Sequence, residues 1–138
     1  MSNVTQLRDK KPENEKITIN LGFVDLGRID LLVQEGFYSN RSDLIRTAIR
    51  NQLESHGEVV SKSLERHTME LGLRDYSVSD LETVREAGEV LHIKVVGLAR
   101  FDPDITPELA LQTIASITVL GALQASTAIK KALEDRIK

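Results

Sequence analysis

The sequence predicts an α+β protein built from two parts. The first is a strand-helix-helix unit that intertwines with a second copy of itself, and the second is a small domain of β–α repeats with parallel strands. Three observations predict this: KITINL, residues 16–21, alternates polar and apolar residues; two helical patterns follow directly; and the form I-x-V-apolar-G occurs twice. We expect a flexible arm over residues 1–15, a first domain over 16–57 and a second domain over 58–138.

The composition excludes several classes of protein. None of the 138 residues is cysteine, which rules out disulfides, thiolate metal sites and thiol nucleophiles. No window approaches the roughly 18 unbroken apolar residues of a transmembrane helix, and residues 1–15 lack the apolar core of a signal peptide. We therefore expect a cytoplasmic protein.

The charge is distributed unevenly along the chain. Of its 18 basic and 21 acidic residues, 8 of each lie in residues 1–57, and the remaining 10 and 13 lie in residues 58–138. A bulk basic surface for nucleic acid is missing, so any contact with DNA requires a local patch on the neutral first part. Aromatic residues make up only 4% of the chain, which disfavours stacking on single-stranded nucleic acid.

Residues 1–15 have the polar, charged composition of an arm that buries little apolar surface. Arg8, Lys10 and Lys11 offer positive charge to phosphates. A solvated tail explains the same composition, so both interpretations stay open.

The first domain reads as one strand and two helices. A period of two in KITINL puts Ile17, Ile19 and Leu21 on one face of the strand. The next stretch, VDLGRIDLLVQEG, has apolar residues at helical spacing and ends at Gly36, which favours a helix end. NRSDLIRTAIRNQLESHG then predicts a second helix, with Asn40 as its cap, Asp43 at the capping-box position and Gly57 as its end.

This first unit is small for a chain that folds alone. It spans about forty residues, near the size below which metals, disulfides or a partner are usually needed. The strand also lacks any neighbour in its own chain with which to pair. A two-fold dimer, in which residues 16–21 of two copies pair antiparallel, satisfies both requirements.

These residues resemble the ribbon-helix-helix DNA-binding proteins of the MetJ, Arc and CopG type. The resemblance rests on KITINL followed by RIDLLVQEGFYSNRSDLIRTAIRNQL, and it covers Lys16 to about Ser55. Gly22 and Phe23 stand where a proline-containing turn is frequent, and Asn40 stands where Ser is usual, although Asn also caps helices well. The resemblance implies a homodimer whose two-stranded ribbon enters the major groove of double-stranded DNA.

The resemblance also implies roles for particular residues. Side chains on the outer face of the ribbon would read base edges, and here these are Lys16, Thr18 and Asn20; polar residues there also simply keep an exposed strand soluble. The start of the second helix would hold a DNA phosphate through Asn40, Arg41 and Ser42. Arg46 and Arg50 read as the solvated side of that helix. The apolar dimer core would comprise Ile17, Ile19, Leu21, Ile29, Leu32, Leu44, Ile45, Ala48 and Ile49.

The second domain contains an internal repeat. IKVVGLAR begins at Ile93 and ITVLGALQ at Ile117, and each precedes a helical segment, the first capped by Thr106 and the second starting near Ser126 or Thr127. Strand and helix in alternation predict parallel strands, as in leucine-rich or other short solenoid repeats. The strands read as buried on both faces, which predicts self-association of residues 58–138 into a tetramer or larger assembly.

The region between the helices and the repeats is less regular. The apolar residues from Val59 to Leu73 suggest a third helix, or a continuation of the second after a kink at Gly57. MELGLR, residues 69–74, also resembles a degenerate earlier copy of the repeat. DYSVSDLETVREAG then predicts a short helix capped near Ser79.

Chemistry-bearing side chains do not form a recognisable catalytic or metal pattern. His56, His67 and His92 lie in separate segments without metal-ligand spacing, and Asp102 and Asp104 read as turn residues around a proline. No phosphate-binding glycine loop or nucleophile elbow occurs. We expect no cofactor, no metal and no enzymatic activity.

The sequence thus predicts a homodimeric, nucleoid-associated DNA-binding regulator, a repressor that reads its operator through the ribbon. Two alternatives stay open. One is an antitoxin whose second part neutralises a toxin protein, although such tails are typically disordered until bound and residues 90–138 read as foldable. The other is a scaffold or filament protein that organises DNA.

Overall fold

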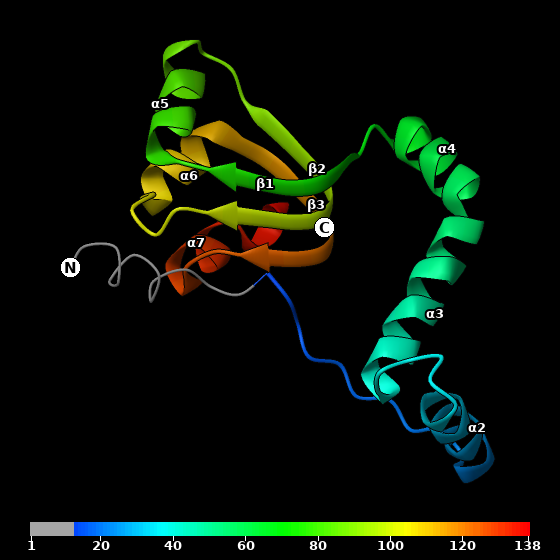
Figure 1. The fold of residues 1–138 in the computed structure, drawn as a ribbon. Helices are drawn as coiled ribbons and strands as arrows, with labels where there is room; N and C mark the ends of the chain where they lie inside the picture. The colour runs from blue at the N-terminus through cyan, green and yellow to red at the C-terminus, as the bar shows by residue number, and fades with distance from the viewer. Residues whose placement is uncertain (1–12) are drawn as a thin grey trace. The chain divides into compact units, whose positions relative to one another are not determined.

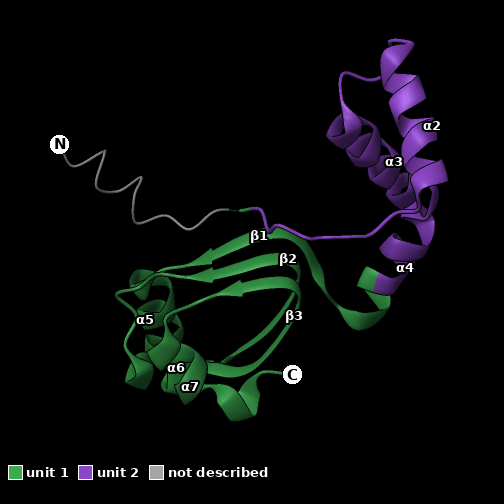
Figure 2. Cartoon of the chain, turned by 90° about the horizontal axis from the view of Figure 1, so that it is seen from below, with its two compact units in different colours: residues 1–13, 64–138 green, residues 14–63 purple. Residues whose placement is uncertain are grey.

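The computed structural model describes residues 13–138, which form two compact units (Figure 2). One unit comprises residues 14–63, and the other comprises residues 64–138 together with Glu13. Most of the expected arm, including Arg8, Lys10 and Lys11, lies outside the described residues. Within the described part of the chain, no helix is long and apolar enough to cross a membrane.

The first unit contains the two expected helices, α2 (Phe23–Gln34) and α3 (Arg41–Ser55). Helix α2 ends where predicted: Gly36 has φ of 88°, and its N–H donates to the Val33 carbonyl at 3.0 Å. Such a positive φ favours glycine and closes the helix. Asn40 caps α3 as predicted, in extended conformation.

Helix α3 ends at Ser55, just before Gly57 as predicted, but its C-cap is His56 and Gly57 is the first residue of the next helix. After His56, the C-cap of α3, the chain enters helix α4 (Gly57–His67) at once, in agreement with the alternative of a continuing helix. Gly57 lacks the positive φ that a terminating glycine adopts. The helix stops at His67, so the later apolar residues of the region, Leu71 and Leu73, belong to a strand.

The second unit alternates strands and helices (Figure 1). Its elements are β1 (Glu70–Tyr76), α5 (Val78–Glu86), β2 (Leu91–Phe101), α6 (Pro107–Thr113), β3 (Ile114–Gln124), α7 (Thr127–Ala132) and a final 3₁₀ turn, η1 (Glu134–Arg136). The strands pair in the order β1-β2-β3, and both pairings are parallel. This confirms parallel strands joined by helices and shows that residues 69–74 are indeed a third copy of the repeat.

The repeat register is fixed by a column of glycines. Gly72, Gly97 and Gly121 pair directly across the three strands, with φ of 131°, 139° and 119°. A Cβ added to Gly97 would lie 2.2 Å from the Gly72 carbonyl oxygen, and one added to Gly121 would lie 2.1 Å from that of Gly97. The strands therefore approach too closely at Gly97 and Gly121 for any residue with a side chain.

Helix starts in this unit are set by short polar caps. The Ser77 side chain accepts from the Asp80 N–H at 3.1 Å, and the Asp80 carboxylate accepts from the Ser77 N–H at 2.9 Å, which completes a capping box. The prediction of a cap near Ser79 is thus displaced by two residues. Thr106 and Ser126 cap α6 and α7 as predicted, with Pro107 in the first turn of α6.

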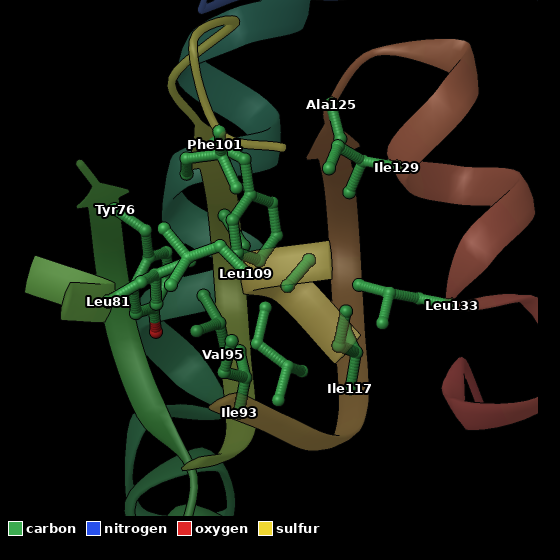
Figure 3. Packing of buried hydrophobic residues seen from close by; sticks show 14 residues of the cluster. Tyr76, Leu81, Ile93, Val95, Phe101, Leu109, Ile117, Ala125, Ile129 and Leu133 are labelled. Atoms are coloured by element: carbon green, nitrogen blue, oxygen red, sulfur yellow. The ribbon is translucent and has the colours of Figure 1, made fainter. Parts of the chain in front are cut away.

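A single apolar core lies between the sheet and its three helices (Figure 3). Alternate residues of the strands point into it, and Leu81, Leu109 and Ile129 meet them from the helices. The Tyr76 and Phe101 rings stack there with centroids 5.0 Å apart. The helices cover one face of the sheet, so within this unit the expected burial of the strands on both faces is not seen.

Candidate nucleic-acid interface

Residues 16–21 carry no strand pairing within the single chain. Their apolar side chains are exposed, Ile17 by 72% and Ile19 by 59%. Lys16, Thr18 and Asn20 are likewise exposed. One chain thus leaves both faces of this segment in water, a condition that a half-apolar strand does not tolerate without a partner.

The rest of the first unit shows the same deficit. No residue between 14 and 63 is buried, although α2 and α3 are both amphipathic. Of the nine side chains predicted to form the dimer core, Ile29, Leu44 and Ile45 are half-buried and the others are exposed, namely Ile17, Ile19, Leu21, Leu32, Ala48 and Ile49.

The predicted phosphate anchor lies at the start of α3. The Asn40 Oδ1 accepts from the Asp43 N–H at 2.8 Å, which satisfies one free amide of the first turn. The Asp43 carboxylate accepts from the N–H and hydroxyl of Ser39, at 3.0 and 3.1 Å, rather than from the cap residue itself. Ser42 is exposed in the first turn.

Arg41 is engaged inside its own unit. Its Nε and Nη2 donate to the two Asp30 carboxylate oxygens at 2.7 and 2.8 Å, a bidentate pair that ties α3 to α2. The hydrogen bond from Arg41 holds the pKa of the Asp30 carboxyl below its ordinary value of 3.8. Sequence reasoning missed this pair, since two opposite charges eleven residues apart give no periodic signal.

The second unit has a pocket of about 500 Å³ at the carboxyl ends of its strands. Loops at this edge of a parallel sheet commonly bind ligands. Here, however, Ser77 and Ser126 are occupied as helix caps, and Arg100 donates to Asp75 at 2.7 Å. Across residues 13–138, no group of three His, Asp or Glu side chains is placed to hold a metal ion.

The family comparison decides what this arrangement belongs to. The ribbon-helix-helix transcriptional regulator family matches residues 12–130. The chain belongs to this family. Members regulate transcription and are not enzymes, so membership suggests a DNA-binding regulator. No curated protein and no solved structure matches the chain.

The match extends well beyond the residues that carried the resemblance. Sequence reasoning identified about forty residues, Lys16 to Ser55, whereas the family match covers α4 and all three strands as well. The β–α repeats therefore fall within the region that defines this family, rather than being an unrelated addition to a DNA-binding unit.

Proposed function

We propose that the protein is a homodimeric repressor that binds double-stranded DNA through a ribbon formed by residues 16–21 of two copies. The observation that carries the proposal is the absence of any buried residue between 14 and 63 in the single chain. Pairing two such units gives the exposed apolar side chains a shared core and gives each strand its missing hydrogen bonds.

The polar face of the ribbon has chemistry suited to base edges. Lys16 can donate to guanine O6 and N7, Asn20 can pair with adenine N6 and N7, and Thr18 offers a hydroxyl and a methyl group. With Ile17 and Ile19 turned into the shared core, alternation directs these three side chains outward. All three are exposed, as such a role requires.

The start of α3 would position the dimer on the DNA backbone. Its first turn presents amide groups and the positive end of the helix dipole, and Asn40 and Ser42 lie there. Arg41 already donates both ends of its guanidinium to Asp30. A phosphate contact by Arg41 would therefore use its remaining donors or compete with that carboxylate.

The second unit disfavours the antitoxin alternative. Toxin-wrapping segments are typically disordered before binding, whereas residues 70–136 form a regular sheet and helices around one core. The scaffold alternative has more support, because one face of that sheet is apolar and no helix or strand among residues 13–138 covers it.

A binding selection on random duplex DNA at fixed salt tests the base-reading assignment. We expect the triple change Lys16→Ala, Thr18→Ala, Asn20→Ala to abolish the sequence preference, because each good pairing with a base edge supplies about 1–3 kcal/mol of discrimination. Salt must be constant because phosphate contacts dominate total affinity. Lys62→Ala is the matched control, since Lys62 is exposed on α4 and pairs with Glu58. A preferred motif that survives the triple change would refute the assignment.

A further inference from the structure

Among the described residues, 13–138, no helix or strand covers one face of the second unit's sheet, which we call the bare face. The helices of this unit all contribute to the core on the opposite side, through Leu81, Leu109 and Ile129. Parallel sheets are almost always covered on both faces, because their strands are apolar on both. A parallel sheet with helices on one side only therefore indicates a missing layer.

The bare face carries a contiguous apolar block. Strand register places Leu71, Val96 and Leu120 in one row across the sheet, and Leu73, Leu98 and Ala122 in the next apolar row. Leu71 and Leu120 are 68% and 59% exposed, while Leu98 at the centre is buried by its neighbours. Polar rows close the block at both ends, with Lys94 and Thr118 at one end and Arg100, Asp75 and Gln124 at the other.

From this pattern we infer that the bare face packs against the same face of a second copy of this chain. The contact is isologous: each copy contributes the same six apolar residues. It deepens the proposed function and rests on it in one respect, because ribbon pairing would raise the local concentration of the second unit.

The size pattern of the block matches its own copy. Sheets that pack face to face lie about 10 Å apart with strands within about 30° of parallel. A two-fold axis running between the sheets along β2 puts β1 of one copy over β3 of the other. Leu73 then meets the partner's Ala122, so a large side chain packs against a small one, and Leu71 meets the partner's Leu120, an apolar contact between two large side chains.

The polar ends of the block fit the same arrangement. At this end Arg100 donates to Asp75 at 2.7 Å and lies 3.9 Å from the Glu13 carboxylate of its own chain, so the positive charge is shared by two carboxylates. Asp75 then faces the partner's Gln124, whose amide can donate to a carboxylate. Lys94, on β2, would face its own symmetry mate, so one repulsion is built into the contact.

The experiment separates this contact from the ribbon. In full-length protein, Ile19→Glu disables the ribbon by placing a carboxylate in its core, and sedimentation then reports association through the second unit alone. We expect Ile19→Glu protein to form a two-copy species. Adding Leu120→Glu should raise its dissociation constant about a hundredfold, because the carboxylate would be buried without a partner. Leu111→Glu, at a 41% exposed position on α6, should leave it unchanged.

Lys94→Gln should change the dissociation constant in the opposite direction, so it distinguishes a specific contact from misfolding. Removing the like-charge pair should tighten the two-copy species a few-fold, which a merely damaged sheet cannot do. Far-UV circular dichroism checks that each variant keeps its strands. If Ile19→Glu protein sediments as a monomer at every concentration, pairing of two copies through the bare face is refuted. If that monomer becomes a dimer when residues 1–12 are removed, those residues occupy the bare face in place of a second copy. The proposed DNA function fails separately, if Ile19→Glu protein still binds duplex DNA as the wild type does.

Discussion

The two units of this chain solve the same problem in different ways. Residues 14–63 form amphipathic helices and an unpaired extended segment and bury nothing, while the second unit alternates strands with helices and buries a core that runs from Tyr76 to Leu133. The second unit succeeds because each helix returns the chain beside its previous strand, so three strands pair within one molecule. In the first unit, residues 16–21 have the pattern of a strand but pair with nothing in their own chain. We propose that its core forms only between two chains, and apolar pattern alone does not distinguish the two cases.

We expect the largest effect from substitutions in the glycine column of the second unit, which folds within one chain. Gly97→Ala or Gly121→Ala places a Cβ 2.2 or 2.1 Å from a backbone carbonyl oxygen, at a φ that side chains rarely adopt. Separation of the strands costs core packing as well as backbone strain, so we expect the unfolding free energy to fall by at least about 3 kcal/mol. Denaturant unfolding followed by circular dichroism measures it.

Two other glycines provide graded controls. Gly72 has φ of 131° but no neighbour within 4 Å of an added Cβ, so Gly72→Ala should cost only the backbone strain, about 1–2 kcal/mol. Gly27 lies inside α2 with open space around it, and Gly27→Ala should stabilise by up to about 1 kcal/mol. Equal effects at all four positions would contradict the close-approach explanation.

The second prediction tests the proposal that residues 14–63 form an apolar core only together with a second copy. Ile17 is 72% exposed in one chain, so a single chain should tolerate Ile17→Glu. In the proposed dimer its side chain is buried, and we expect the change to lower the unfolding free energy of the first unit by about 2–5 kcal/mol. Thermal unfolding of the wild-type first unit should also rise in midpoint with protein concentration.

Val90→Glu is the control for that experiment. Val90 is 54% exposed, precedes β2, and has no place in the proposed ribbon, so the change should alter thermal stability little. A concentration-independent midpoint together with a silent Ile17→Glu would show that the first unit is stable as a single copy.

Local signals in the sequence were sufficient for much of this fold. The caps Asn40, Thr106 and Ser126 and the end of α2 at Gly36 depend on neighbouring residues, so short patterns predict them. The repeat predicted that the strands that hold Gly97 and Gly121 run parallel, and this is confirmed. Leu71 and Leu73 were also compatible with a helix, because a short apolar run does not distinguish strand from helix until its pairing is known.

Long-range features could not be predicted from the sequence in the same way. The Asp30–Arg41 pair depends on how the turn between α2 and α3 folds back, and the bare sheet face depends on which side all three helices take. The base-reading residues Lys16, Thr18 and Asn20 remain predictions, because their role is defined by a second chain and by DNA.

The smallest expected effect concerns the pair that restrains Arg41. Because Arg41 lowers the pKa of Asp30, the pair stabilises the first unit above the ordinary carboxyl pKa of 3.8, and this contribution is lost as pH falls through the folded-state pKa. Asp30→Asn should remove that part of the acid dependence of unfolding. The pair is exposed, so the change in stability should be small.

The same substitution distinguishes the two roles of Arg41. If its guanidinium also serves the phosphate anchor, Asp30→Asn frees it and should tighten binding to all DNA sequences equally, with a steeper salt dependence. Arg41→Ala should weaken binding equally for all sequences. Should Asp30→Asn leave DNA affinity and its salt slope untouched while Arg41→Ala only lowers stability, Arg41 is a tie between α2 and α3, and the anchor consists of Asn40, Ser42 and the helix amides alone.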